Sequence, residues 1–166
     1  MFAQWKEIIA ILSTVALLSM GTKTALAQDH NHAHEHDAGK PAQLTLNNGK
    51  KWIADDNLRQ AMSRIRDALS TELPAIHSGL ATTEQYQALA QKTNNQIEFM
   101  IKNCKLDQKT DVMLHLVLAD IMAGADAMAG KDINKAHKGV EKIAEALDNY
   151  GTYFAHPSWH GVKSAH

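Results

Sequence analysis

The chain has 166 residues and a formal net charge of −1 at pH 7, a near-balance that gives no reason to expect a nucleic-acid partner. Its single cysteine excludes an internal disulfide and leaves a cysteine-linked homodimer as an open alternative. The length suffices for one domain with a real core, but not for two.

The first 27 residues have the order of an export signal. A short region containing Lys6 precedes an apolar run of 13 residues, and the small-residue site Ala25-Leu26-Ala27 follows. The run is shorter than the roughly 20 residues that a membrane-spanning helix needs. No later segment approaches that length, so we expect cleavage after Ala27, a periplasmic location and no membrane span in the mature chain.

Four histidines on alternate residues follow the expected cleavage site, with carboxylates between and beside them: His30, His32, His34 and His36. Neutral imidazoles beside carboxylates are ligands for copper, zinc and nickel, and chance placement of four within seven residues is improbable. We therefore favour a metal-binding tract over a merely polar tail. Residues 28–51 as a whole are polar and lack periodicity, which predicts a flexible arm.

Residues 52–157 predict an all-α fold of four helices, followed by a tail at 158–166. Asp55-Asp56, Thr82 with Gln85 three residues on, and Asp107 predict helix starts, whereas Gly130 and Pro157 predict helix ends. Short breaks favour antiparallel neighbours, and hence an up-down-up-down four-helix bundle. The expected inner faces are Leu58, Met62, Ile65, Leu69 and Leu73; Tyr86, Leu89, Thr93, Ile97, Met100 and Cys104; Met113, Val117, Ile121, Gly124 and Met128; and Ile133, His137, Val140, Ala144, Leu147, Gly151 and Phe154.

The run Leu58-Arg59-Gln60-Ala61-Met62-Ser63-Arg64-Ile65 resembles the corresponding stretch of the cytochrome b562 family, and Ala127-Met128-Ala129-Gly130-Lys131 is similar to its third turn. The resemblance implies a haem electron carrier with Met62 as one axial ligand. The family places its second ligand, a histidine, late in helix four, where this chain has Tyr150 or Gly151. The nearest histidine is His156, and the absence of Cys-x-x-Cys-His excludes covalent c-type haem.

A second metal site is expected at one end of the bundle. Folding the helices about their loops places Cys104 near His156 and His160, with Trp52 and Trp159 shielding them. A thiolate with two imidazoles is a copper or zinc ligand set. The alternative is a buried structural cysteine, which is common.

Other candidate groups have plainer explanations. Met62, Met100 and Met113 lie at a depth similar to that of His115, but methionine at helical spacing more often fills a core. Asp111, four residues before His115, would pair with it on the surface. We assign His77 and His137 structural or surface roles.

No nucleophile elbow, phosphate loop or zinc-protease motif occurs in the sequence, so we expect no enzyme. The favoured function is a periplasmic accessory protein that binds metal ions, copper or zinc, through the histidine arm. The alternatives are a b562-like haem carrier and a noncatalytic bundle that binds a protein partner.

Overall fold

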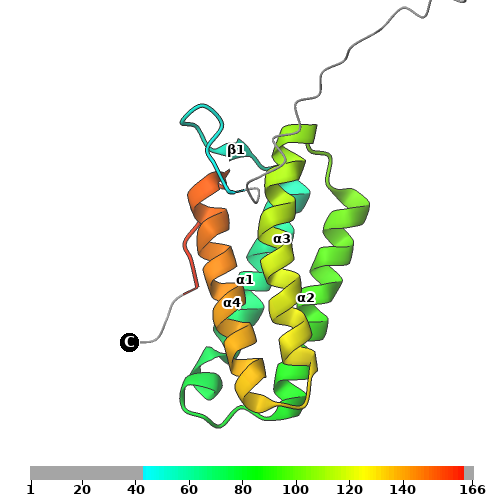
Figure 1. Ribbon diagram of the computed structural model, residues 1–166, viewed down its shortest axis with the longest axis vertical. Helices are drawn as coiled ribbons and strands as arrows, with labels where there is room; N and C mark the ends of the chain where they lie inside the picture. The colour runs from blue at the N-terminus through cyan, green and yellow to red at the C-terminus, as the bar shows by residue number, and fades with distance from the viewer. Residues whose placement is uncertain (1–42, 163–166) are drawn as a thin grey trace, which may run out of the picture. The chain divides into compact units, whose positions relative to one another are not determined.

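The computed structural model describes residues 43–162, which form four helices and two very short strands. The predicted signal and the tract of His30, His32, His34 and His36 lie outside the described residues. The elements in chain order are β1 (Trp52–Ile53), α1 (Asp56–His77), α2 (Thr83–Asn103), α3 (Gln108–Ala129), α4 (Ile133–Tyr153) and β2 (Phe154–Ala155). Each helix contacts the next along the chain, and α1 also contacts α4, as expected for a four-helix bundle (Figure 1).

The helix starts are set by local side-chain caps. Asp55, Thr82, Asp107 and Asp132 each accept a hydrogen bond from a backbone N–H in the first turn of the helix that follows. Thr82 and Gln85 form the predicted capping box. Each such cap contributes about 1 kcal/mol. The three predicted helix starts are therefore confirmed, and α4 has an additional cap at Asp132.

The core faces of α1 and α2 are those predicted, whereas that of α4 is rotated. Ile133 and His137 begin the predicted face of α4, but Ile133 is exposed and His137 is half-buried. Tyr150 was not expected inside, yet it is fully buried. The buried residues of α4 are Ala136, Gly139, Val140, Ile143, Ala146, Leu147 and Tyr150.

Two glycines allow α3 and α4 to approach closely. A Cβ atom on Gly124 would lie 2.6 Å from the carbonyl oxygen of Gly139, and one on Gly139 would lie 2.5 Å from the carbonyl oxygen of Gly124. No ordinary side chain fits at such distances, because the atoms that it would meet include backbone. The α3–α4 contact, which is the most extensive in the bundle, depends on this pair.

The chain before α1 is ordered further back than the predicted arm boundary at Lys51. Asn48 and Gly49 both have positive φ, and Asn47 and Lys50 exchange backbone hydrogen bonds of 2.8 and 3.0 Å around them. This is the type I′ turn that an Asn-Gly pair favours. The Trp52 indole N–H donates to the Thr45 carbonyl at 2.6 Å, and Leu44 packs against the core, so the bundle holds the chain from Leu44 onward although most of residues 43–51 are exposed.

Strands β1 and β2 form a parallel pair that the sequence analysis did not anticipate. Trp52 pairs with Phe154 and Ile53 with Ala155, so the chain entering α1 lies beside the chain leaving α4. The ring of Phe154 is fully buried and stacks on Tyr150 with a centroid distance of 5.2 Å. This pairing closes one end of the bundle and positions His156, which directly follows β2.

Helix α3 is long and apolar enough, by length and composition alone, to cross a membrane. The expectation that no later segment approaches that length is therefore wrong for residues 108–129. A core helix of a soluble protein passes the same test, and the apolar residues of α3 include Leu114, Val117 and Ile121, which are buried in the bundle.

We expect Gly124→Ala to destabilise the fold. Alanine improves helix propensity by about 1 kcal/mol, but overpacking typically costs about 1–3 kcal/mol, and here the methyl group meets backbone. The free energy of unfolding, measured with urea, should fall by about 1–3 kcal/mol. Gly130→Ala is the matched control, because its φ is −72° and its Cβ would approach nothing closer than 3.4 Å. Equal stability of the two variants would contradict the proposed role of Gly124.

Candidate functional site

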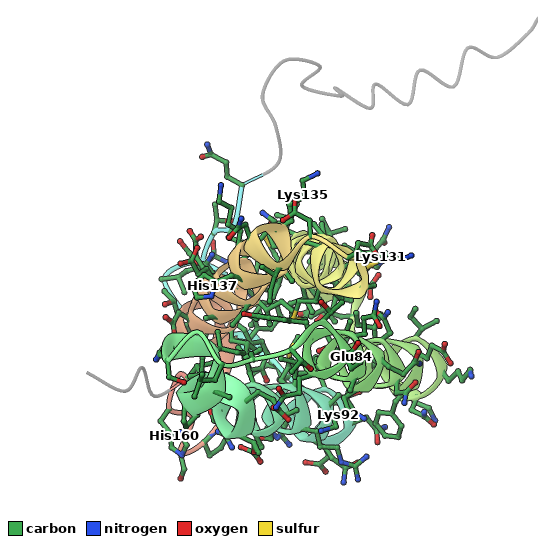
Figure 2. The ribbon with its side chains drawn as sticks, turned by 90° about the horizontal axis from the view of Figure 1, so that it is seen from below. Glu84, Lys92, Lys131, Lys135, His137 and His160 are labelled. Atoms are coloured by element: carbon green, nitrogen blue, oxygen red, sulfur yellow. The ribbon has the colours of Figure 1, made fainter. Side chains whose placement is uncertain are left out.

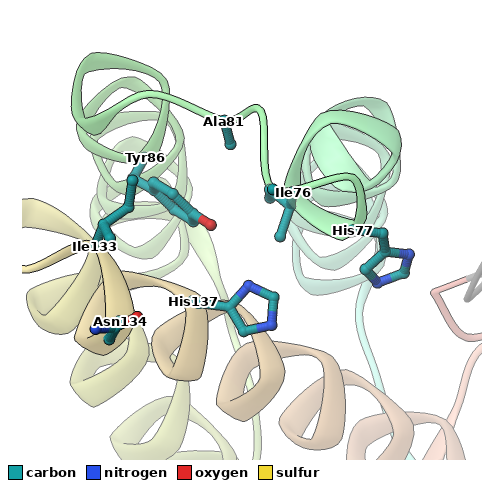
Figure 3. A pocket seen from close by; sticks show the side chains of 8 residues that line it. Ile76, His77, Ala81, Tyr86, Ile133, Asn134 and His137 are labelled. Carbon is teal, nitrogen blue, oxygen red and sulfur yellow. The ribbon is translucent and has the colours of Figure 1, made fainter.

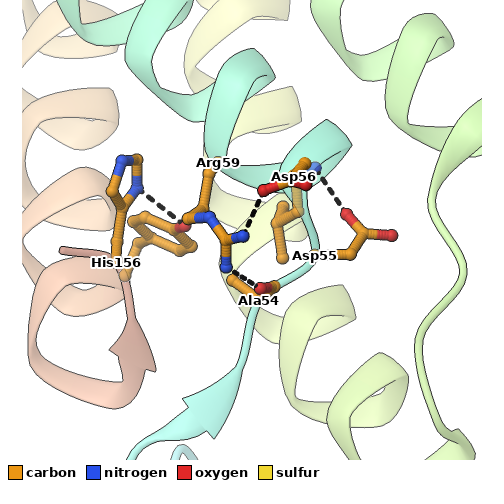
Figure 4. Close-up of polar contacts among 7 residues, drawn as sticks. Ala54, Asp55, Asp56, Arg59 and His156 are labelled. Atoms are coloured by element: carbon orange, nitrogen blue, oxygen red, sulfur yellow. Dashed lines mark hydrogen bonds and ion pairs between the residues drawn. The ribbon is translucent and has the colours of Figure 1, made fainter.

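Asp55 joins the start of α1 to the end of α2. One carboxylate oxygen accepts from the Leu58 N–H at 2.7 Å, and the other accepts from the Lys105 N–H at 2.6 Å. The Asn57 side-chain amide donates to the Asn103 carbonyl at 2.8 Å, which adds a second bond across the same junction. Figure 4 shows Asp55 at the start of α1, beside Asp56 and Arg59. The position of Cys104, between Asn103 and Lys105, is thereby fixed against α1.

Cys104 is half-buried at the C-cap of α2, and its backbone N–H donates to the Met100 carbonyl at 2.9 Å. Burial, followed by the charge and hydrogen bonding of the Asp55 carboxylate, raises the pKa of this thiol to about 12. The thiol is therefore protonated at neutral pH. It is a poor nucleophile in that form, which argues against a catalytic cysteine.

A pocket of about 180 Å³ opens between α2 and α3 beside this thiol. It is lined by Met100, Ile101, Cys104, Asp111, Leu114, His115 and Leu118. His115 is exposed, and its Nδ1 lies 2.8 Å from the backbone oxygen of Asp111 and 3.4 Å from the carboxylate of Asp111. A carbonyl oxygen only accepts hydrogen bonds, so Nδ1 carries the proton. In the neutral ring, Nε2 then has a free lone pair.

His156 belongs to a different cluster, on the opposite side of the first turns of α1. Its Nδ1 lies 3.0 Å from the hydroxyl of Tyr150 (Figure 4). The centroid of its ring lies 4.8 Å from that of Trp159. Burial, then the charges of Arg59 and Arg66, lower the pKa of His156, and burial raises that of Tyr150. The neutral imidazole therefore accepts from the tyrosine hydroxyl.

The predicted site of Cys104, His156 and His160 is not assembled. Within residues 43–162, no three His, Cys, Asp or Glu side chains stand close enough to hold a metal ion. Cys104 faces Asp55 at the cap of α1, whereas His156 faces Arg59 and Arg66, which lie further along that helix. His160 is exposed and lies on the outside of the bundle in Figure 2.

The residues that the b562 resemblance implies do not fit haem as they are packed. Met62 is fully buried in the core, which agrees with its expected inner position. The position of the family's second ligand holds Tyr150, which is also fully buried, and the nearest histidine, His156, engages the Tyr150 hydroxyl through Nδ1. Met62 and His156 thus offer haem no prepared pair of axial ligands.

The predictions for the methionines and surface histidines are largely confirmed. Met100 is buried like Met62, and Met113 is half-buried against the Thr45 hydroxyl, with oxygen and sulfur 3.9 Å apart. His115 pairs with Asp111 on the surface, as expected. The plain role of a core-filling thioether therefore holds for Met62, while Met100 also lines the pocket beside Cys104.

His77 and His137 line two adjoining pockets between α1 and α4, with volumes of about 340 and 250 Å³. Figure 3 shows His77 at the end of α1 and His137 on α4, with Ile76 and Tyr86 on the wall. His137 Nε2 lies 3.6 Å from the Glu141 carboxylate. Figure 2 shows His137 near the surface, which agrees with the predicted surface role.

The sequence analysis missed the Asp55–Lys105 bond, the Tyr150–His156 pair, and the combination of Met100, Cys104, Asp111 and His115 around one pocket. A signal for the last was present. Met100 and Cys104 are four residues apart, as are Asp111 and His115, so each pair lies on one helix face. The sequence does not show that these two helix faces are turned toward each other, which brings both pairs to one pocket.

Comparisons of the chain with protein-family models, with curated proteins and with solved structures find no match.

We expect the stability of the protein to fall as the pH drops below about 6.5, partly through His156. Its pKa is depressed in the folded state, so the unfolded chain binds more protons and acid favours unfolding. This contribution is fully present above the unfolded pKa of about 6.5 and is lost as the pH falls through the folded value. Urea unfolding at pH 7.5 and pH 5.5 should show a smaller pH effect in His156→Gln, because glutamine accepts from Tyr150 without titrating.

His137→Gln is the control, since its ring is half-exposed and pairs only with Glu141. If the two variants have the same pH dependence as the unaltered protein, His156 does not couple protonation to folding.

Proposed function

We propose that this protein is a periplasmic accessory protein that binds copper or zinc ions through its histidine tract and is not an enzyme. The observation that carries the proposal is the alternation of His30, His32, His34 and His36 behind an export-signal-like segment. Imidazoles at such density bind borderline divalent ions, and a tract without a rigid first shell suits capture or buffering rather than catalysis. The helical domain is proposed to be an up-down-up-down bundle to which the metal-binding tract is attached.

The bundle supports this role by anchoring the chain just after the tract. Thr45 contacts Met113 on α3, and the Trp52 indole N–H donates to the Thr45 carbonyl, so the described chain begins on the bundle. The chain between His36 and Gln43 reaches at most about 25 Å, given about 3.6 Å per residue.

Removal of the four tract histidines should weaken divalent ion binding. We expect the variant with glutamine at His30, His32, His34 and His36 to bind Cu(II) and Zn(II) at least about tenfold more weakly, a loss of about 1.4 kcal/mol or more. Isothermal titration of the mature protein measures this. A control replaces four other histidines by glutamine, namely His77, His137, His160 and His166, and should retain the binding.

Equal affinity of the two quadruple variants would contradict the proposal. An absorption spectrum of the protein recovered from the periplasm tests the competing electron-carrier function. Stoichiometric haem that is lost in Met62→Leu would favour a b562-like carrier. Protein that carries neither haem nor tightly bound metal would favour the partner-binding bundle.

A further inference from the structure

We propose that the pocket between α2 and α3 is a Cu(I) site whose ligands are the thiolate of Cys104, the thioether of Met100 and Nε2 of His115. This inference deepens the proposed metal-handling function and rests on it for its role in the cell. The expected partners of Cys104 were His156 and His160. In this proposal its partners are instead Met100 and His115, which line the same pocket as Cys104.

The ligands come from two facing helices at matched spacing. Met100 and Cys104 are one helical turn apart at the end of α2, and Asp111 and His115 are one turn apart near the start of α3. All four line the pocket of about 180 Å³. The short connection through Asp107 keeps the two helix ends together, and the bond from Lys105 to Asp55 fixes the loop.

The chemistry of the ligands selects a soft monovalent ion. Thiolate and thioether sulfur prefer Cu(I), whereas zinc sites use thiolate, imidazole and carboxylate without thioether. One thiolate and one Cu(I) form a neutral pair, which suits a half-buried pocket with buried Met100 on its wall.

The backbone oxygen of Asp111 sets the tautomer of the neutral His115 ring, with the proton on Nδ1. Its Nδ1 donates to the backbone oxygen of Asp111, and the Asp111 carboxylate lies nearby at 3.4 Å. Metal-binding histidines use their second nitrogen in this way, with a carbonyl or carboxylate as the partner that fixes the tautomer. Nε2 is thereby left free for the ion.

Binding requires one exposed side chain to move and one proton to leave. The three His, Cys, Asp and Glu groups around this pocket are not within ligating distance of one another as they stand in residues 43–162. The His115 side chain is 69% exposed, so its ring has room to turn toward the sulfur atoms, exchanging the bond to the Asp111 backbone oxygen for the bond to the ion. The S–H bond of Cys104 breaks, an S–Cu bond forms, and the proton passes to solvent with no change in oxidation state.

The test uses the full mature chain with the tract silenced by glutamine at His30, His32, His34 and His36. Cu(I) is supplied anaerobically with ascorbate and competed against bathocuproine disulfonate. We expect one Cu(I) per chain. Cys104→Ser should weaken binding by at least about 100-fold, and Met100→Leu and His115→Gln by at least about 10-fold each, because even the loss of a group that only orients a ligand costs about 10–100-fold.

The matched controls are Met128→Leu, a fully buried methionine elsewhere on α3, and His137→Gln, both of which should bind as tightly as the parent. Circular dichroism and urea unfolding establish that each variant is folded. The proposal is overturned if the tract-silenced chain binds no Cu(I). It is also overturned if affinity depends on Cys104 alone, because a thiol adduct without the other ligands is not this site.

The failure of this site and the failure of the proposed function are distinguishable. If the chain with an intact tract binds Cu(II) and Zn(II) but the silenced chain has no Cu(I) site, the proposed function stands and the Cu(I) site between α2 and α3 is wrong. If the silenced chain binds one Cu(I) but the chain with an intact tract binds no divalent ion, the Cu(I) site stands and the proposed function of the tract fails.

Discussion

The Asp55 carboxylate holds together the end of the bundle on which the candidate sites depend. One oxygen caps α1 and the other binds the backbone N–H of Lys105, so a single side chain fixes the start of one helix against the end of another. Burial, and after it the same carboxylate, raises the pKa of the neighbouring Cys104 thiol to about 12. Asp55 therefore contributes both to the position of Cys104 and to the protonation of its thiol.

The first turns of α1 also separate two groups that the sequence places at the same end. Cys104 and its pocket lie on the α2–α3 side, whereas His156 lies with Tyr150 and Trp159 on the α4 side. Arg59 donates to the Ala54 carbonyl and pairs with Asp56 between them. The β1–β2 pair closes the end by joining the chain before α1 to the chain after α4.

Features governed by neighbours in sequence were predictable, and those governed by packing between helices were not. Caps at Asp55, Thr82 and Asp107 follow from side chains that reach only a few residues. The turn at Asn48-Gly49 also depends only on neighbouring residues. The polar composition around it nevertheless led to the prediction of a flexible arm. The prediction of which face of α4 is buried was wrong because alanine fits both a buried and a half-exposed position. Ala136 is buried and Ala144 is half-buried, although the sequence analysis placed Ala144 on the inner face. The partners of Cys104 depend on the rotation of α3, which spacing alone does not fix.

The most direct measurement is X-ray absorption at the copper edge of the tract-silenced mature protein loaded with one Cu(I) per chain. It reports the ligand atoms themselves, and the histidines of the tract are absent from the sample. We expect two sulfur ligands and one nitrogen ligand, with one sulfur lost in Met100→Leu and the nitrogen lost in His115→Gln. A shell of nitrogen and oxygen alone, or a single sulfur unchanged by these substitutions, would contradict a Cu(I) site between α2 and α3.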